Sequence, residues 1–225
     1  RVEVRGSRRT ALGPKWMQAR LSARYPDQPT PSLTTVYNVL KRAGLITSRR
    51  TRRRVSPGGV VVDGIKSPNG LWSADLKGQF LMRYAHWCYP LTVMDHASRY
   101  VLGCHGLRNT RGLPARAVFE RLFLEYGLPE RMRTDNGVPF ASLGTGGLSR
   151  LSIWWIRLGI VPERITPGRP QQNGRHERMH RTLKRAVVQP PAPNLRAQQR
   201  RFDVFCRHYN NERPHEALEQ RTPAS

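Results

Sequence analysis

Three acidic residues, Asp75, Asp135 and Glu177, lie in segments whose composition could support chemistry on a charged substrate. The segments read Leu-Trp-Ser-Ala-Asp-Leu-Lys-Gly, Arg-Thr-Asp-Asn-Gly-Val-Pro-Phe and Pro-Gln-Gln-Asn-Gly-Arg-His-Glu-Arg-Met-His-Arg-Thr-Leu-Lys. Mg²⁺ takes oxygen ligands and keeps several waters, so a few convergent carboxylates and substrate phosphates are enough to bind it. Carboxylates packed together need a cation or raised pKa values, because like charges repel. We therefore predict that these acids bind Mg²⁺ or Mn²⁺.

The charge balance points to the partner. The chain of 225 residues has 39 Lys and Arg residues against 15 Asp and Glu residues, which gives a formal net charge of +24. Such an excess favours a polyanion over an acidic small molecule, and it exceeds what a merely solubilising surface needs. Together with the three acids, it indicates metal-dependent cutting and joining of DNA.

Length and cysteine content limit the class of protein to which the chain can belong. The length fits one core of about 100–150 residues plus a small domain. No apolar run reaches the roughly 18–20 residues of a membrane span, and no signal peptide opens the chain, so we expect a cytoplasmic protein without a membrane partner. Cys88, Cys104 and Cys206 are widely spaced and predict reduced, buried thiols. Because the chain starts at Arg1 without Met and stops at Ser225 in a turn-like segment, we expect a fragment of a longer protein.

Residues 1–54 are predicted to form a small all-α domain. Helical spacing covers residues 13–24 and 32–44, and Gly44 is a typical C-terminal cap. The polar, Pro-containing turn between the helices suggests a helix-turn-helix DNA-binding domain with a basic tail, and an ordinary structural helix pair is the alternative. The second helix is expected to bury Leu33, Val36, Leu40 and Ala43. The candidate DNA contacts are Thr34, Thr35, Tyr37, Asn38 and Lys41 on that helix, and Arg49, Arg50, Arg52, Arg53 and Arg54 after it.

Residues 55–68 are rich in Gly and Pro and predict a linker, followed by a catalytic domain over residues 69–225. From Leu71 the sequence alternates, which predicts a strand with Ser73, Asp75, Lys77 and Gln79 on its polar face and Trp72, Ala74, Leu76 and Phe80 on its apolar face. Strands are also predicted at 88–95, 100–106 and 131–135. Helices are predicted at 114–126, 149–158 and 175–188, with a final helix ending near residue 209.

This order indicates an α/β fold in which a mixed sheet could gather the three acids. Asp75 lies in the first strand, Asp135 ends the fourth, and Glu177 is in the first turn of a helix. On that helix Glu177 shares a face with His180, Arg181 and Lys184. Arg178, Arg181 and Lys184 are predicted to bind phosphates. The alternative for Glu177 is an acid favoured only by the helix dipole.

Other candidates compete for a role in the site. His176 and His180 have zinc-like spacing without a Cys pair or a Glu-x-x-His pattern, so we expect them to contact DNA or lie on the helix surface. Asp95 could be a ligand, but its neighbours favour a turn-capping role. Glu212 and Glu216 could replace Glu177 as the third acid, although they lack its loop and basic helix face. Trp154 and Trp155 are expected in the core.

The segment around Asp75, the turn 134–137, the run 171–184 and the closing stretch 209–218 strongly resemble bacterial insertion-sequence transposases with a retroviral-integrase-type core. The resemblance spans about residues 10–225. It implies a ribonuclease H-like mixed five-stranded sheet flanked by helices, preceded by the all-α domain.

The same resemblance implies a mechanism and partners. Asp75 would bridge two Mg²⁺ or Mn²⁺ ions, with Asp135 and Glu177 each holding one, and water and then a 3′-hydroxyl would attack a phosphodiester in line. Lys184 would contact the DNA end. The expected partners are double-stranded transposon ends and target DNA, bound by a homo-oligomer in a prokaryotic cytoplasm, associated with the nucleoid.

The leading hypothesis is a DDE transposase that catalyses DNA-end cleavage and strand transfer. One alternative is a transposase-derived DNA-binding protein that has lost its chemistry, which the intact acids argue against. Another is a ribonuclease H-like nuclease that cuts without joining, which the basic face of helix 175–188 and the separate N-terminal domain argue against.

Overall fold

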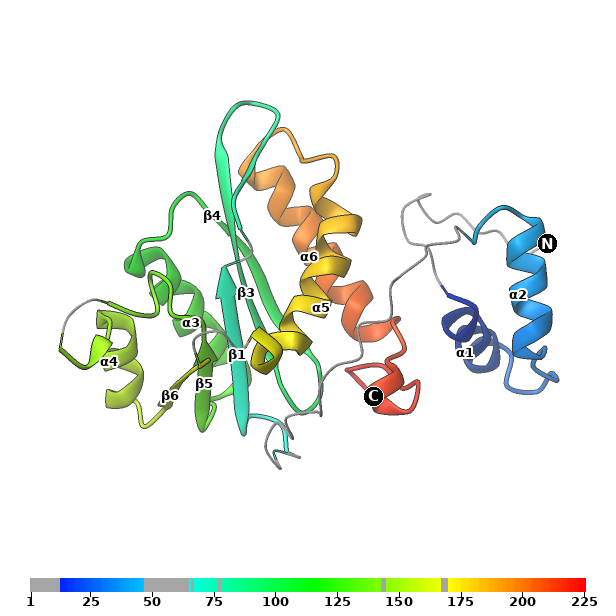
Figure 1. Cartoon of the computed structure of the whole chain (residues 1–225), viewed down its shortest axis with the longest axis horizontal. Coiled ribbons are helices and arrows are strands. Elements are labelled where there is room, and N and C mark those ends of the chain that lie inside the picture. Colours follow the sequence, from blue (N-terminus) through cyan, green and yellow to red (C-terminus); the bar gives the residue numbers. More distant parts are fainter. Residues whose placement is uncertain (1–12, 47–64, 66, 77, 143–144, 167–169) are drawn as a thin grey trace. The chain divides into compact units, whose positions relative to one another are not determined.

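A computed structural model describes residues 13–46, 65, 67–76, 78–142, 145–166 and 170–225 (Figure 1). The chain divides into two compact units, one comprising residues 1–59, 211–223 and 225 and the other residues 60–210 and 224. The predicted core ran from 69 to 225, whereas contacts group residues 211–223 with the helical unit. The basic run 49–54 and most of the predicted linker 55–68 lie outside the described residues.

The helical unit contains the two predicted helices. Helix α1 (Pro14–Arg24) begins with Pro, whose missing N–H costs nothing in a first turn. Helix α2 (Leu33–Arg42) begins after Ser32, whose side chain accepts a hydrogen bond from Thr35 N–H at 3.2 Å. Val36 and Leu40 are buried, but Leu33 and Ala43, which were predicted to face inward, are exposed. A short helix that packs on one partner buries only a narrow stripe. The helix-turn-helix assignment remains a prediction.

Residues 212–216 form ion pairs with α1 in this unit. Lys15 Nζ lies 2.9 Å from Glu216 Oε1, and Arg20 Nη2 lies 3.3 Å from Glu212 Oε2. Both pairs are exposed, so each adds little stability. Because Glu212 and Glu216 group with α1, neither is in the unit that contains Asp75.

The second unit is built on a mixed sheet. In the described part of the chain its strands are β1 (Leu71–Leu76), β2 (Phe80–Leu81), β3 (Trp87–Asp95), β4 (Val101–Leu107), β5 (Arg131–Thr134) and β6 (Val161–Arg164). Strand β3 is antiparallel to β1, β2 and β4, and β5 lies parallel between β1 and β6. The mixed sheet confirms the α/β prediction, but in the described part of the chain it has six strands instead of the expected five. Strands β2 and β6 were not assigned from the sequence.

Both faces of the sheet are covered by helices. Helices α3 (Gly112–Tyr126) and α4 (Arg150–Arg157) contribute to one buried apolar cluster, and α5 (Gly174–Leu183) and α6 (Leu195–Asn211) contribute to the other. Figure 1 shows α5 and α6 together on one side of the sheet. The first cluster includes Trp72, Ala74, Phe119, Met132 and Trp155, and the second includes Met94, Cys104, Met179, Leu183 and Phe202.

The alternation predicted for the first strand holds to Leu76 and then fails. Trp72, Ala74 and Leu76 pack in the cluster under α3 and α4, whereas Phe80 packs in the cluster under α5 and α6. Strand β1 ends at Leu76, so the turn before β2 breaks the two-residue period. On the predicted polar face of β1, Ser73 is fully buried against His176 of α5, whereas the Asp75 side chain keeps 18% of its surface exposed.

The structure also bears on the predictions for Asp95, the three cysteines and membrane-spanning helices. Asp95 caps a turn as predicted: its Oδ1 accepts bonds from Ser98 N–H and Ser98 Oγ, both at 2.7 Å. Cys88, Cys104 and Cys206 are free thiols; Cys88 and Cys104 are buried as predicted, whereas Cys206 is half-buried. Burial raises the pKa of Cys88 and of Cys206 to about 12, so both are protonated. The described helices include none with the length and apolar character needed to cross a membrane.

Candidate active site

The register of the sheet places Asp75 and Asp135 on neighbouring strands. Strands β1 and β5 are parallel, and Ala74 pairs with Thr134, so one of the two acids follows each member of this pair. Asp75 is the second-last residue of β1, and Asp135 comes directly after β5. The Asp75 side chain is 18% exposed, and Asp135 is half-buried.

The turn after β5 fixes the Asp135 carboxylate. Asp135 Oδ1 accepts a hydrogen bond from Gly137 N–H at 3.1 Å. A Cβ atom at position 137 would lie 3.1 Å from Asp135 Oδ2, so a side chain there would crowd the carboxylate. Asn136 Nδ2 donates to the carbonyl of Ile165 at 3.1 Å, which ties this turn to the residue after β6.

Helix α5 carries Glu177 at the edge of its buried face. Glu177 is exposed, while His176 before it and His180 three residues later are buried. The predicted helix 175–188 is α-helical to Leu183 and then makes a π-helical turn over Lys184–Val188. Arg178, Arg181 and Lys184 are all exposed, as phosphate-binding residues must be.

Two histidines of α5 bind hydroxyls of the sheet, which corrects the expectation that they contact DNA or lie on the helix surface. His176 Nδ1 lies 2.9 Å from Ser73 Oγ, and His176 Nε2 lies 2.6 Å from Thr92 Oγ1. His180 Nε2 lies 2.7 Å from the same Thr92 oxygen. The imidazoles therefore face inward and pair with buried hydroxyls that also lie within hydrogen-bond distance of the carbonyls of Met94 and Asp75.

The hydrogen-bond pattern assigns the protons in this cluster. Thr92 Oγ1 has one proton and donates it to the carbonyl of Asp75 at 3.0 Å. It therefore accepts from the Nε2–H of both His176 and His180. Burial lowers the pKa of His176 to about 3, so that ring is neutral. Ser73 Oγ lies 2.9 Å from its Nδ1 and 3.4 Å from the carbonyl of Met94, so we assign the hydroxyl proton to the shorter contact, in which Nδ1 accepts. Thr92 thus links the backbone of Asp75 to both rings.

The described residues form one group with three closely placed metal-ligand atoms. It consists of Asp75, His176 and His180, whose ligand atoms lie within 4.8 Å of one another. Asp135 and Glu177 are outside the group, so the three predicted acids do not meet within that distance. The structure brings Asp75 and Asp135 to adjacent strand ends and puts Glu177 on the helix that covers them.

Asn173 provides a test of whether a cation suits this site. It is 5% exposed, and its Nδ2 lies 3.5 Å from Asp75 Oδ2. Its Oδ1 is buried without a hydrogen-bond partner among the described residues. A buried amide oxygen without a partner costs free energy, but it is the amide nitrogen of Asn173 that faces Asp75. The fit of a divalent cation therefore depends on the carboxylates, whose oxygens are the ligands that such an ion prefers, and Asp75, Asp135 and Glu177 could hold it.

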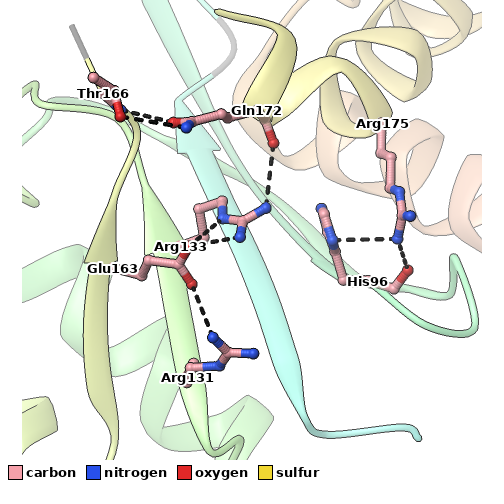
Figure 2. A network of polar contacts seen from close by, with 7 residues as sticks. All are labelled: His96, Arg131, Arg133, Glu163, Thr166, Gln172 and Arg175. Atoms are coloured by element: carbon pink, nitrogen blue, oxygen red, sulfur yellow. Dashed lines mark hydrogen bonds and ion pairs between the residues drawn. The ribbon is translucent and has the colours of Figure 1, made fainter. Parts of the chain in front are cut away.

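A partly buried ion pair links β5 to β6 (Figure 2). Arg133, whose side chain is 5% exposed, donates to Glu163 Oε1 from Nε at 3.0 Å and from Nη2 at 2.5 Å. The two residues are partners across β5 and β6. Arg131 Nη1 lies 3.9 Å from Glu163 Oε2. Sequence reasoning missed this pair, because β6 had not been assigned.

The same network holds the start of α5 (Figure 2). Arg133 Nη1 donates to the carbonyl of Gln172 at 3.4 Å, and Gln172 Oε1 accepts from Thr166 N–H at 2.7 Å. Arg175 Nη1 donates to the carbonyl of His96 at 2.7 Å. Burial, together with the charges of Arg175 and Arg133, lowers the pKa of His96 to about 3. These hydrogen bonds hold the residues on both sides of Asn173. They also hold the first turn of α5, which contains Glu177.

The predicted DNA contacts of α2 are on its surface. The exposed residues are Thr34, Thr35, Tyr37, Asn38 and Lys41. Their role remains a prediction, as does that of the basic run 49–54.

Two sequence profiles described as integrase core domain match this chain, over residues 66–170 and 158–223. The chain is 27% identical over 201 residues to the insertion element IS407 uncharacterized 31.7 kDa protein of Burkholderia multivorans, covering 84% of this chain and 66% of the relative. It is 29% identical over 210 residues to the IS476 uncharacterized 39.2 kDa protein of Xanthomonas euvesicatoria, covering 88% and 56%. It is 31% identical over 121 residues to the Gag-Pol polyprotein of baboon endogenous virus, covering 54% of this chain and 7% of the polyprotein.

Solved structures share the fold. The HTLV-2 integrase catalytic core domain in complex with magnesium superposes with a TM-score of 0.54 at 16% identity, covering 70% of this chain and 95% of that one. A simian T-cell lymphotropic virus intasome in complex with PP2A regulatory subunit B56 gamma gives a TM-score of 0.61 at 19% identity, covering 92% and 73%. The expected mixed sheet flanked by helices is therefore the ribonuclease H-like fold of integrase cores.

Proposed function

Because the chain belongs to the integrase core domain family, we propose that it is a DDE transposase that cleaves DNA ends and joins them to target DNA. The observation that supports the proposal is the register of β1 and β5, in which Ala74 and Thr134, the residues directly before Asp75 and Asp135, are paired on neighbouring strands. Glu177 supplies the third carboxylate from the exposed edge of that helix.

The three acids would hold two divalent ions, Mg²⁺ or Mn²⁺, with Asp75 shared between them. A divalent cation held by these carboxylates would supply the chemistry that activates a water or a 3′-hydroxyl and stabilises the leaving oxygen during in-line displacement. The HTLV-2 integrase core that shares the fold is a magnesium complex, which supports this choice of ion.

The basic residues of α5 would hold the DNA next to the acids. Arg178 and Arg181 are exposed on the same helix as Glu177, and Lys184 follows two turns after Glu177. Their charges would bind backbone phosphates and position a strand for attack. The hydrogen bonds of Arg133 and Arg175 would keep the helix start fixed while the phosphodiester enters.

The partners follow from the same reaction. A transposase must bind two ends of its element and a target, so we propose double-stranded DNA as substrate and a homo-oligomer as the active form. The trimeric and dimeric forms of the HTLV-2 integrase core support oligomerisation. The bacterial insertion-element relatives support action on DNA in a prokaryotic cytoplasm, at the nucleoid.

The test is Glu177→Gln in a cleavage and strand-transfer assay on labelled DNA ends with Mg²⁺. We expect both reactions to be abolished while DNA affinity is kept, because the change removes one charged ligand and preserves shape. Glu130→Gln, an exposed acid before β5, is the matched control. Cleavage at the wild-type rate by Glu177→Gln would refute the triad.

The same assay separates the rival functions. A nuclease would cut the labelled ends without joining them. A protein that only binds DNA would shift the ends in a gel without cutting them, with either metal.

A further inference from the structure

His180 faces Asp75 at a distance that suits a shared ion. His180 Nδ1 lies 3.6 Å from Asp75 Oδ2, which is longer than the 2.7–3.2 Å range of an N–H···O hydrogen bond. Two ligands at about 2.1 Å from one ion are roughly 3.0 Å apart at a right angle and roughly 3.4 Å apart at a tetrahedral angle. A small movement of either side chain would therefore let both atoms bind one ion.

Thr92 orients the His180 ring for this purpose. Its single hydroxyl proton goes to the carbonyl of Asp75, so Thr92 Oγ1 accepts from His180 Nε2–H at 2.7 Å. In the neutral ring, the nitrogen that faces Asp75 is then the one with the lone pair. Metal-binding histidines commonly donate their other ring N–H to an oxygen, which fixes the tautomer and the ring orientation.

His176 has a different part in the same cluster. Both of its nitrogens are hydrogen-bonded, Nδ1 to Ser73 Oγ at 2.9 Å and Nε2 to Thr92 Oγ1 at 2.6 Å. It is fully buried, and its ring meets that of His180 edge-on with centroids 4.7 Å apart. His176 therefore holds Thr92 and His180 in place, while the Nδ1 of His180 faces the Asp75 carboxylate.

We propose that His180 Nδ1 is an additional ligand of the ion that Asp75 holds. The proposal rests on the function proposed above, since it assumes that Asp75 binds a metal. The site would thus combine carboxylate oxygens with one imidazole nitrogen.

The consequence is a changed preference among metals. Imidazole is a good ligand for transition metals and a poor one for Mg²⁺, which prefers oxygen. This site should therefore bind Mn²⁺ more tightly relative to Mg²⁺ than three carboxylates alone would.

The experiment is pulsed electron paramagnetic resonance of Mn²⁺ bound to the full chain, with calorimetric binding of Mn²⁺ and Mg²⁺. The wild type should show nitrogen coupling from a directly bound imidazole, which should change when the histidines are labelled with ¹⁵N. In His180→Gln the coupling should vanish and Mn²⁺ affinity should fall about tenfold or more, with Mg²⁺ affinity changed much less. His86→Gln, at an exposed histidine in the turn between β2 and β3, should behave as wild type.

The results that would contradict the role of His180 differ from the result that would contradict the proposed function. Mn²⁺ bound to the wild type without nitrogen coupling would overturn the role of His180, and this measurement does not depend on any variant folding. Coupling that persists in His180→Gln would assign the nitrogen to another histidine and would also overturn it. If Asp75→Asn binds Mn²⁺ as tightly as the wild type does, the metal site of the proposed function is wrong instead.

Discussion

Thr92 is the residue whose removal tests the polar cluster most directly. It is fully buried on β3, and its hydroxyl contacts the carbonyl of Asp75 at 3.0 Å, His176 at 2.6 Å and His180 at 2.7 Å. Thr92→Val keeps the β-branched shape that suits a strand and deletes only the hydroxyl. Thr92→Ser keeps the hydroxyl and deletes a methyl group, so it is the matched control.

The expected cost follows from the contacts. Thr92→Val leaves one carbonyl and two imidazole N–H groups without their partner, and each buried orphan costs about 1–3 kcal/mol. We expect about 3 kcal/mol, the lower end of the sum, because α5 can shift and admit water to the rings. Thr92→Ser should cost about 1 kcal/mol, the value of one buried methyl group. For a domain of this size, 3 kcal/mol lowers the melting temperature by roughly 6–12 °C.

The assay is calorimetric melting and urea unfolding of the full chain, followed by circular dichroism of the aromatic side chains in the sheet unit. DNA-end cleavage should fall in Thr92→Val and largely survive in Thr92→Ser, because only the first frees the Asp75 carbonyl and both rings. If the two variants are equally stable to within about 1 kcal/mol, the Thr92 hydroxyl is not bound as described.

Four further outcomes are expected. DNA affinity should fall on the order of 10³-fold between 50 and 200 mM salt if about six phosphates are contacted, and a flat salt profile would place the basic excess away from DNA. The double change Asn38→Ala with Lys41→Ala should weaken binding to the element's own ends more than it weakens nicking of nonspecific duplex; equal losses would argue against a separate recognition helix. Lys184→Ala should reduce joining and end affinity with Mn²⁺ affinity kept, and Lys184→Arg should recover part of the loss; a drop in Mn²⁺ affinity as large as that of Asp135→Asn would contradict this role. The pKa of His96 is lowered from 6.5 to about 3 by burial, so the fold keeps this ring neutral; its contribution to stability is complete above pH 6.5 and is lost as pH falls toward 3. By pH 5 this loss is about 2 kcal/mol, and urea unfolding of His96→Gln should show a shallower pH dependence than the wild type.

The elements that sequence predicted well are those with a strong local pattern. The strand predicted at 88–95 is β3, and the helix predicted at 149–158 is α4, because alternation and helical spacing of large apolar residues reflect burial directly. Strand β6 was not predicted because Pro162 and Glu163 occupy its middle, and a Pro in a short run of residues argues against a strand. It is tolerated at the edge of the sheet, where β5 is its one neighbour among the described strands.

The acids could be identified from their segments, but their surroundings could not. Asp75 and Asp135 reach the same end of the sheet through the β1–β5 register, which depends on a crossover through α3 that no local pattern specifies. The Arg133–Glu163 pair depends on the next register, between β5 and β6. The residues around each acid are determined by which strands pair and in which register. Because the paired strands are far apart in the sequence, the spacing of residues along the chain does not predict these neighbours.

The orientation of α5 shows where a local signal existed and was misread. His176, Met179, His180 and Leu183 follow the spacing of a buried helical stripe, and all four are buried. If only apolar residues are counted, the stripe consists of Met179 and Leu183 alone, and the helix then appears polar on every face. The sheet face beneath it presents hydroxyls, so imidazoles are the side chains that can be buried there with their hydrogen bonds satisfied. The bonds to Thr92 and Ser73 therefore set the rotation of α5, and that rotation leaves Glu177 at the exposed edge of the helix.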